Sequence, residues 1–184
     1  MEILIIVAVI AVVVIVFVVG YNGLVRLRNA VQNAWSQIDV QLKRRYDLIP
    51  NLVETVKGYA SHERETFEAV TQARANAMAA EGKGAGERAQ METELSQALF
   101  NLRAVAEAYP DLKANQNFAQ LQSELTNTED RIAYARQGYN NAVNSYDNRR
   151  QAVPTNVIAS VAGFASFEYF EADPDSREPV KVEF

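Results

Sequence analysis

The sequence feature that most constrains the fold is an unbroken apolar run from Ile3 to Val19. As a helix, its 17 residues would span roughly 25 Å, which falls slightly short of a hydrocarbon core about 30 Å thick. Continuing the helix to Tyr21 and a little beyond supplies the missing length and puts a tyrosine near the interface, where aromatic residues are enriched. We therefore expect a transmembrane anchor at residues 1–23, with lipid contact along residues 3–25.

Two other interpretations of the apolar run stay open. A buried core strand or helix could have this composition, although a soluble domain has little need for so many consecutive β-branched residues. A cleaved signal peptide is the second, but the positively charged segment that precedes its apolar part is missing. Arg26 and Arg28 follow the run, and the positive-inside rule then favours the cytoplasm for the rest of the chain.

The composition excludes several classes of protein. With 48% hydrophobic and 22% charged residues, the chain is typical of a folded protein rather than a disordered one. Its net charge of -5 gives no overall attraction to nucleic acid, so no nucleic-acid partner is expected. The absence of cysteine excludes disulfides, thiolate metal sites and a cysteine nucleophile.

Beyond the anchor, the sequence predicts helices almost throughout, because apolar residues recur in steps of three and four. No proline separates the anchor from the first of them, at residues 24–42, so we expect one continuous rod. A second helix is expected to start near Ser61, a good N-cap, and to end at the glycine-rich stretch 81–87. Pro110 ends a third helix, and Asp111 is placed to cap the next one.

A fourth helix has the most regular pattern of the chain. Its seam alternates steps of three and four through Phe118, Leu121, Leu125, Thr128, Ile132, Ala135, Tyr139, Ala142 and Tyr146. This period favours shallow coiled-coil-like packing, with Tyr134, Tyr139 and Tyr146 in the core. The breaks between helices are short and imply antiparallel neighbours. The predicted fold is therefore all-α: an N-terminal transmembrane helix, then an antiparallel bundle of about four long helices over residues 24–152.

Residues 153–184 differ from the bundle and are expected to form a short helix and an extended tail. The short helix is predicted within residues 154–163, with Val157, Ile158 and Val161 on one side. Residues 180–184 alternate apolar and charged side chains, as a strand does. The tail either packs on its own bundle or docks on a neighbouring subunit or partner. Its candidate interface residues are Phe167, Tyr169, Phe170, Val180, Val182 and Phe184.

The stretch QLKRRYDLIPNLVETVKGY, at residues 41–59, contains a proline inside a helical pattern. The apolar seam continues on both sides of Pro50, so we predict that the helix kinks there and ends near Gly58. The missing proline N–H would free the carbonyl of Tyr46. Arg45, or an arginine of another subunit, could bind that carbonyl.

The three cations before this proline do not predict a ligand site. Lys43 lies four residues after Asp39, and Arg44 lies three residues before Asp47, so both have partners at helical spacing. Arg45 has no such local partner.

The sequence offers little for catalysis or metal binding. His62 is the one histidine of the chain, and no Glu-x-x-His pair of the kind used in di-iron bundles occurs. With Glu65 three residues later, His62 fits a helix start on the surface better than a metal ligand or an acid–base group. A Ser-His-Asp set would need the same histidine, and no local motif supports one. We predict no catalytic residue, no cofactor and no metal site.

Two blocks carry a resemblance to a known family: YNGLVRLRNAVQNAWSQIDVQLKRRYDLIPNLVETVKGYASHE at residues 21–63 and REPVKVEF at residues 177–184. With the apolar anchor, they make the chain resemble the LemA family of bacterial membrane proteins over nearly its whole length. The resemblance implies an antiparallel helical bundle on a single N-terminal membrane helix, and similarity to a magnetosome-associated relative. It implies no agreed catalytic activity or cofactor. We accordingly expect a single-pass protein of the bacterial cytoplasmic (inner) membrane. The side of the bundle stays open, with the positive-inside rule slightly favouring the cytoplasmic over the periplasmic side.

These features favour a non-enzymatic, membrane-anchored structural or scaffolding protein that forms a homo-oligomer through its bundle and tail. An alternative is an accessory or signalling module whose tail binds another membrane protein, such as a protease or transporter. An enzyme built on His62 and nearby carboxylates is the third and weakest hypothesis.

Overall fold

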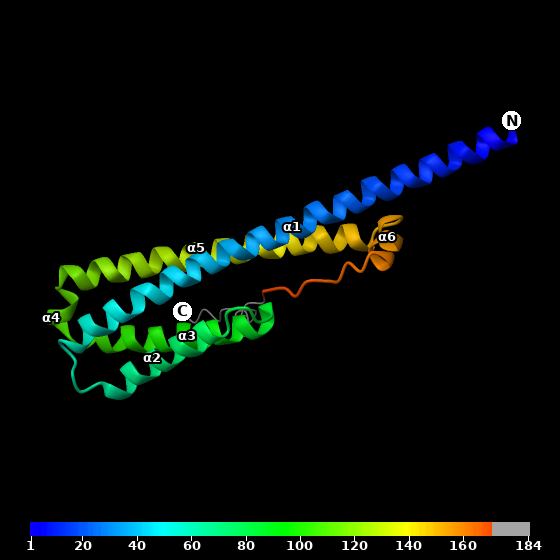
Figure 1. Ribbon diagram of the computed structural model, residues 1–184. Coiled ribbons are helices and arrows are strands. Elements are labelled where there is room, and N and C mark those ends of the chain that lie inside the picture. Colours follow the sequence, from blue (N-terminus) through cyan, green and yellow to red (C-terminus); the bar gives the residue numbers. More distant parts are fainter. Residues whose placement is uncertain (171–184) are drawn as a thin grey trace, which may run out of the picture. The chain divides into compact units, whose positions relative to one another are not determined.

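In a computed structural model that describes residues 1–170, the chain forms six α-helices and no strand within that range (Figure 1). They are α1 (Glu2–Lys57), α2 (Arg64–Ala79), α3 (Ala85–Glu107), α4 (Pro110–Lys113), α5 (Gln116–Gln151) and α6 (Thr155–Val161). The predicted all-α fold with a long apolar N-terminal helix is confirmed.

Helix α1 runs for 56 residues without a break, so the predicted anchor and the first bundle helix are one continuous rod. By length and composition, it is the one helix of the described residues that could cross a membrane. The side chains of the apolar run are exposed, whereas Leu24, Ile38 and Leu42 further along are completely buried. The helix therefore changes from an all-round apolar surface to a one-sided apolar seam.

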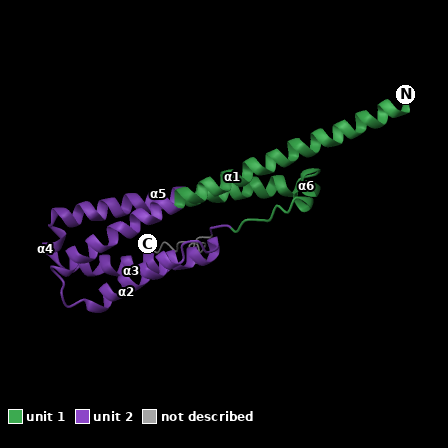
Figure 2. Cartoon of the chain, viewed as in Figure 1, with its two compact units in different colours: residues 1–38, 135–168 green, residues 39–134, 169–184 purple. Residues whose placement is uncertain are grey.

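The chain divides into two units, coloured separately in Figure 2. Unit 1 comprises Met1–Ile38 and Ala135–Glu168, and unit 2 comprises Asp39–Tyr134 together with Tyr169 and Phe170 of the described residues. Both α1 and α5 contribute residues to each unit.

In unit 2, α2 and α3 form a helical hairpin whose turn contains Gly82. Its φ of 84° is a left-handed conformation that glycine adopts without steric cost. The N-cap position of α2 is occupied by Glu63 and not by Ser61 as predicted. The Glu63 side chain makes no capping hydrogen bond there. Helix α3 starts at Ala85, inside the stretch expected to be a break, because the glycines at 82 and 84 suffice for the turn.

The connection between α3 and α5 also differs from the prediction. Pro110 ends α3 but begins the short helix α4, where its missing N–H costs nothing at the first helical position. The cap of α5 is Asn115 and not Asp111: the Asn115 side-chain oxygen accepts a hydrogen bond from the Phe118 backbone N–H at 3.1 Å. The extra turn of α4 displaces the helix start by several residues.

In unit 1, the segment after α6 runs back along α5, fixed by two tyrosines. The Tyr146 hydroxyl donates to the Ala165 carbonyl at 2.7 Å, and the Tyr139 hydroxyl donates to the Glu168 carbonyl at 2.8 Å. Tyr139 and Tyr146 are buried as predicted, but Tyr134 is 78% exposed and was wrongly placed in the core.

The faces of two helices also need correction. On α5 the buried position after Tyr139 is Val143, and the predicted Ala142 is only half-buried. On α6 the buried residues are Thr155, Ile158 and Ala159, whereas Val157 and Val161 are exposed, so the predicted apolar side is divided between two faces.

Candidate functional site

The interior of unit 2 contains a buried charge cluster centred on Arg45 of α1. Arg45 is fully buried and forms an ion pair with the equally buried Glu92 of α3. Its Nη1 also donates to Glu129 Oε1 of α5 at 2.8 Å and to Ser96 Oγ of α3 at 3.1 Å. A charge buried in this way must be paired, because leaving water is costly for an ion. Arg45 thus links three helices through carboxylate partners that local spacing could not identify.

Tyr46, the next residue, completes the cluster. Its hydroxyl donates to the Glu92 carboxylate and lies 3.4 Å from the carbonyl of Ala77 in α2. Burial raises the pKa of the Tyr46 hydroxyl above its ordinary value, and the positive charges of Arg88 and Arg45 oppose that rise. The neutral phenol is therefore the stable form, and it acts as a donor to the glutamate.

The predicted local ion pairs of the cationic stretch are wrong. Lys43 pairs with Asp47 at 2.9 Å rather than with Asp39, and Asp39 instead pairs with the buried Arg88 of α3. Arg44 pairs with Glu124 of α5 rather than with Asp47. Helix packing pairs Arg44 and Asp39 with residues of other helices, and among these three pairs only that of Lys43 stays within α1.

Helix α1 continues through Pro50, so the chain does not end a helix there. The kink at Pro50 remains a prediction, but the expected arginine is present at the carbonyl of Tyr46. It is Arg74 of α2, whose Nε donates to that carbonyl at 2.8 Å, and not Arg45, which is occupied in the charge cluster. Arg74 supplies the hydrogen bond that the proline cannot donate.

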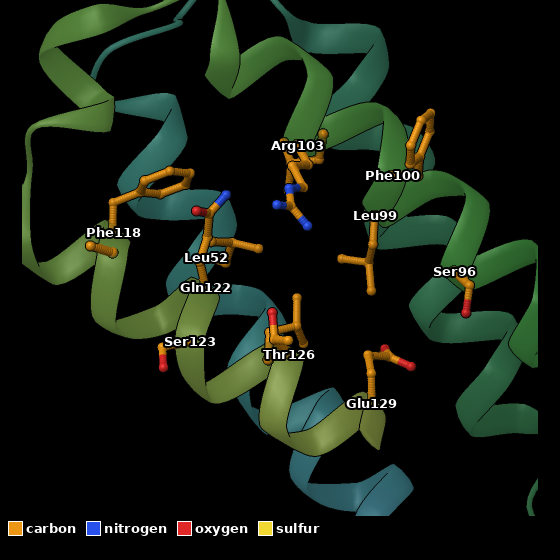
Figure 3. A pocket seen from close by; sticks show the side chains of 13 residues that line it. Leu52, Ser96, Leu99, Phe100, Arg103, Phe118, Gln122, Ser123, Thr126 and Glu129 are labelled. Carbon is orange, nitrogen blue, oxygen red and sulfur yellow. The ribbon is translucent and has the colours of Figure 1, made fainter. Parts of the chain in front are cut away.

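Beside the cluster lies an open groove, which we call the α3–α5 groove. Its volume is about 490 Å³. It is lined by Leu52 of α1; by Ser96, Leu99, Phe100, Leu102 and Arg103 of α3; and by Phe118, Ala119, Gln122, Ser123, Leu125, Thr126 and Glu129 of α5. Figure 3 shows that Leu99 and Arg103 face Gln122 and Thr126 across it.

The groove combines an apolar floor with polar edges. One end reaches Ser96 and Glu129, which bind Arg45, so the charge cluster fixes the positions of α3 and α5 there. Arg103, two turns further along α3, has a largely exposed side chain whose only ion pair among the described residues, to Glu107, is 4.0 Å long. Phe100 on the edge is 65% exposed. The arrangement can bind an elongated segment that alternates apolar and polar side chains.

Sequence reasoning missed this groove and the cluster. Leu95 and Leu102 lie on one buried face of α3, and the helix has a second, largely polar row beside it. Arg88, Glu92 and Leu99 are buried and Ser96 is exposed, and the four recur in steps of four, four and three, which is the helical spacing of one face. That polar row was the available signal for a second packed surface.

The remaining candidate residues lie apart from the groove. His62 is exposed in the turn before α2, and residues 1–170 contain no group of three or more potential metal-ligating side chains. Phe167 packs edge-on against Tyr146, with ring centres 5.1 Å apart. Phe170 is buried and Tyr169 is 40% exposed. The other predicted interface residues, Val180, Val182 and Phe184, lie outside the described residues.

Comparison with known proteins identifies the family. Protein LemA of Metamycoplasma hominis is 28% identical over 182 residues, which cover 96% of this chain and 83% of that protein. Magnetosome protein MamQ 2 of Paramagnetospirillum magneticum is 28% identical over an alignment of 185 residues. The alignment covers 87% of this chain and 68% of that protein. None of these names indicates a catalytic activity.

These relatives and the long apolar part of α1 support a single-pass membrane protein. The sequence profile of the LemA family matches residues 34–184, which is most of the chain. The resemblance read from the sequence is therefore confirmed, and the chain belongs to the LemA family.

Proposed function

We propose that this protein is a non-enzymatic, membrane-anchored structural protein that assembles with copies of itself. In the assembly, residues 180–184 of one copy occupy the α3–α5 groove of another. The observation that carries the proposal is the groove itself, with its apolar floor, its polar edges and the exposed ring of Phe100.

The groove and the tail match in pattern. In an extended segment, alternate side chains point to opposite faces, so Val180, Val182 and Phe184 share one face and Lys181 and Glu183 the other. The apolar face suits the floor of the groove, and the carboxylate of Glu183 suits the exposed Arg103. Side-chain groups of Gln122 and Thr126 can bind the backbone of an extended peptide.

The dimensions agree as well. Five extended residues cover about 13 Å, and the groove follows α5 from Phe118 to Glu129, about 16 Å along the helix. Anchoring by α1 also favours association, because copies held in one membrane meet at a high effective concentration.

A cross-linking experiment tests the proposal, since the chain has no native cysteine. One copy carries Thr126→Cys in the groove, and a second copy with a different tag carries Val182→Cys. After co-expression and mild oxidation, we expect a disulfide-linked product that contains both tags. Gln120→Cys, which is exposed on α5 outside the groove lining, is the matched control and should yield little product.

Mass photometry of the detergent-extracted full chain gives the second measurement. Thr126→Arg and deletion of residues 177–184 should each shift the protein from oligomer to monomer, whereas Gln120→Arg should not. A parent chain that is strictly monomeric would overturn self-assembly. A third chain carries both Thr126→Cys and Val182→Cys, and a disulfide that forms only within this chain would overturn the binding of the tail to another copy.

A further inference from the structure

Helix α6 of unit 1 packs against α1 at the end of the apolar run. Thr155, Ile158 and Ala159 are buried, and the Ile158 side chain lies so close to Gly20 that a Cβ there would come within 2.5 Å of its Cδ1. The next segment adds a second contact, because the ring of Phe164 packs edge-on against Tyr21 with ring centres 5.5 Å apart. The position of α6 along α1 is therefore set by Gly20 and Tyr21.

Residues 153–164, which contain α6 and which we call the α6 hairpin, are apolar and exposed on the side away from these contacts. Val153, Val157 and Val161 recur every four residues and are 83%, 62% and 77% exposed. Single exposed valines are common on soluble proteins, but Val157 and Val161 lie one turn apart on α6 and Val153 is exposed in the turn before it, and we call these three residues the strip. Because the buried residues already contact α1, no described part of the chain covers this strip.

The height of the strip coincides with the expected edge of the bilayer. A hydrocarbon core of about 30 Å takes roughly 20 helical residues, so a span that begins at Ile3 ends near residue 22. Gly20 and Tyr21 then lie within a few ångströms of the boundary between acyl chains and headgroups. The α6 hairpin, held against these two residues, lies at the same depth.

Two arginines lie beside the α6 hairpin. The Arg28 guanidinium is 5.6 Å from the ring centre of Phe164, and the Arg149 side chain lies next to Gly23. Both are exposed, and neither forms an ion pair with any residue from 1 to 170. Arginines at this height are placed to bind lipid phosphates while their stems lie along apolar groups.

We propose that the α6 hairpin is a second membrane contact, in which Val153, Val157 and Val161 enter the lipid surface that α1 crosses. The partner is the phospholipid interface itself, with apolar contacts from the valines and phosphate contacts from Arg28 and Arg149. The inference rests on the membrane anchoring of α1, which is part of the proposed function. It differs from the lipid contact of the apolar run because its apolar contacts come from valines more than 130 positions later in the sequence.

Spin labels on single cysteines test this in the full chain, reconstituted at one copy per nanodisc of phosphatidylcholine and phosphatidylglycerol. The labelled sites are Val157→Cys and Val161→Cys on the strip, Asn156→Cys on another face of α6, Tyr134→Cys on α5 and Val13→Cys in the span. We expect labels at 13, 157 and 161 to collide with oxygen severalfold more than with a water-soluble nickel chelate. The label at 134 should show the reverse, and the label at 156 should be more exposed to the chelate than that at 157.

The outcomes separate this inference from the anchoring that it assumes. If the label at 13 lies in lipid while those at 157 and 161 resemble the one at 134, the second membrane contact is overturned and the anchor stands. Low accessibility of 157 and 161 to both reagents would mean that protein covers the strip, which also overturns the proposal. A label at 13 that is open to the chelate would refute the anchor itself.

Discussion

Arg45 has lost all contact with water, and its charge is balanced mainly by a glutamate that is equally buried. Removing one partner of such a pair strands the other charge in the interior, which costs about 3–5 kcal/mol. Because Arg45 keeps Glu129 as a partner, we expect Glu92→Leu to lower the free energy of unfolding by up to this amount, measured by urea unfolding followed by circular dichroism. The double variant Arg45→Leu with Glu92→Leu should recover much of the loss, because neither fully buried charge remains; Glu129, which also loses Arg45, keeps 39% of its side-chain surface in water.

The exposed pair of Arg44 and Glu124 is the matched control for that prediction. Both side chains keep more than a third of their surface in water, so Glu124→Ala should cost less than about 1 kcal/mol. Equal losses of unfolding free energy in Glu92→Leu and Glu124→Ala would contradict the role assigned to burial. So would a double variant of Arg45 and Glu92 whose loss equals the sum of the losses in its two single variants.

Because of Tyr46, the stability that this cluster provides should depend on pH in the alkaline range. Burial raises the pKa of its hydroxyl, so the unfolded chain releases this proton near pH 10 and the folded chain only at higher pH. The stability contribution is present below about pH 10 and is lost as the pH rises through the folded pKa. The stability difference between parent and Tyr46→Phe, measured by urea unfolding, should therefore shrink above about pH 10. A difference that stays constant or grows would refute this.

Helix α1 tolerates Pro50 in its interior with help from α2. The Arg74 Nε donates to the carbonyl of Tyr46, which otherwise would accept from the backbone N–H of residue 50. Arg74→Met should therefore destabilise the parent by about 1 kcal/mol or more, the effect of a lost hydrogen bond to a charged group. In a Pro50→Ala background the alanine N–H satisfies the carbonyl, so the same change should cost clearly less. Thermal unfolding of the four chains of this double-mutant cycle measures the coupling.

Zero coupling in that cycle would mean that Arg74 and Pro50 act independently. The cycle also bears on the kink, because Pro50→Ala removes the clash of the proline ring with the preceding turn. A spin-label distance between positions on either side of residue 50 should lengthen in Pro50→Ala if the parent helix is bent.

The helices themselves were predictable, since the spacing of apolar residues along α1, α3 and α5 is a local property of the sequence. The charge cluster and the groove were not, because they depend on which helix faces meet. Arg44 has Asp47 at helical spacing but pairs with Glu124, and the freed carbonyl of Tyr46 was foreseen although its donor was not. On the seven-residue α6, the pattern is too short to say which of its apolar residues face inward.

At the scale of the whole molecule, the continuous α1 joins a membrane span directly to the interior of a folded unit. The topology of the chain is the side of the membrane on which the residues after the span lie. The positive-inside rule favours the cytoplasm, because Arg26 and Arg28 follow the span closely. The rule counts cations within a short distance of the span, and both arginines meet this condition.

Thiol labelling in intact bacterial cells tests this topology on full-length chains with single cysteines. Tyr134→Cys, at a position 78% exposed on α5, should react with a membrane-impermeant maleimide only after the cells are permeabilised. Glu2→Cys, on the other side of the span, should react in intact cells, because a single crossing places the two positions on opposite faces. The reverse pattern would put the folded units in the periplasm and contradict the rule for this chain. Labelling of both positions in intact cells would show that α1 does not cross the membrane.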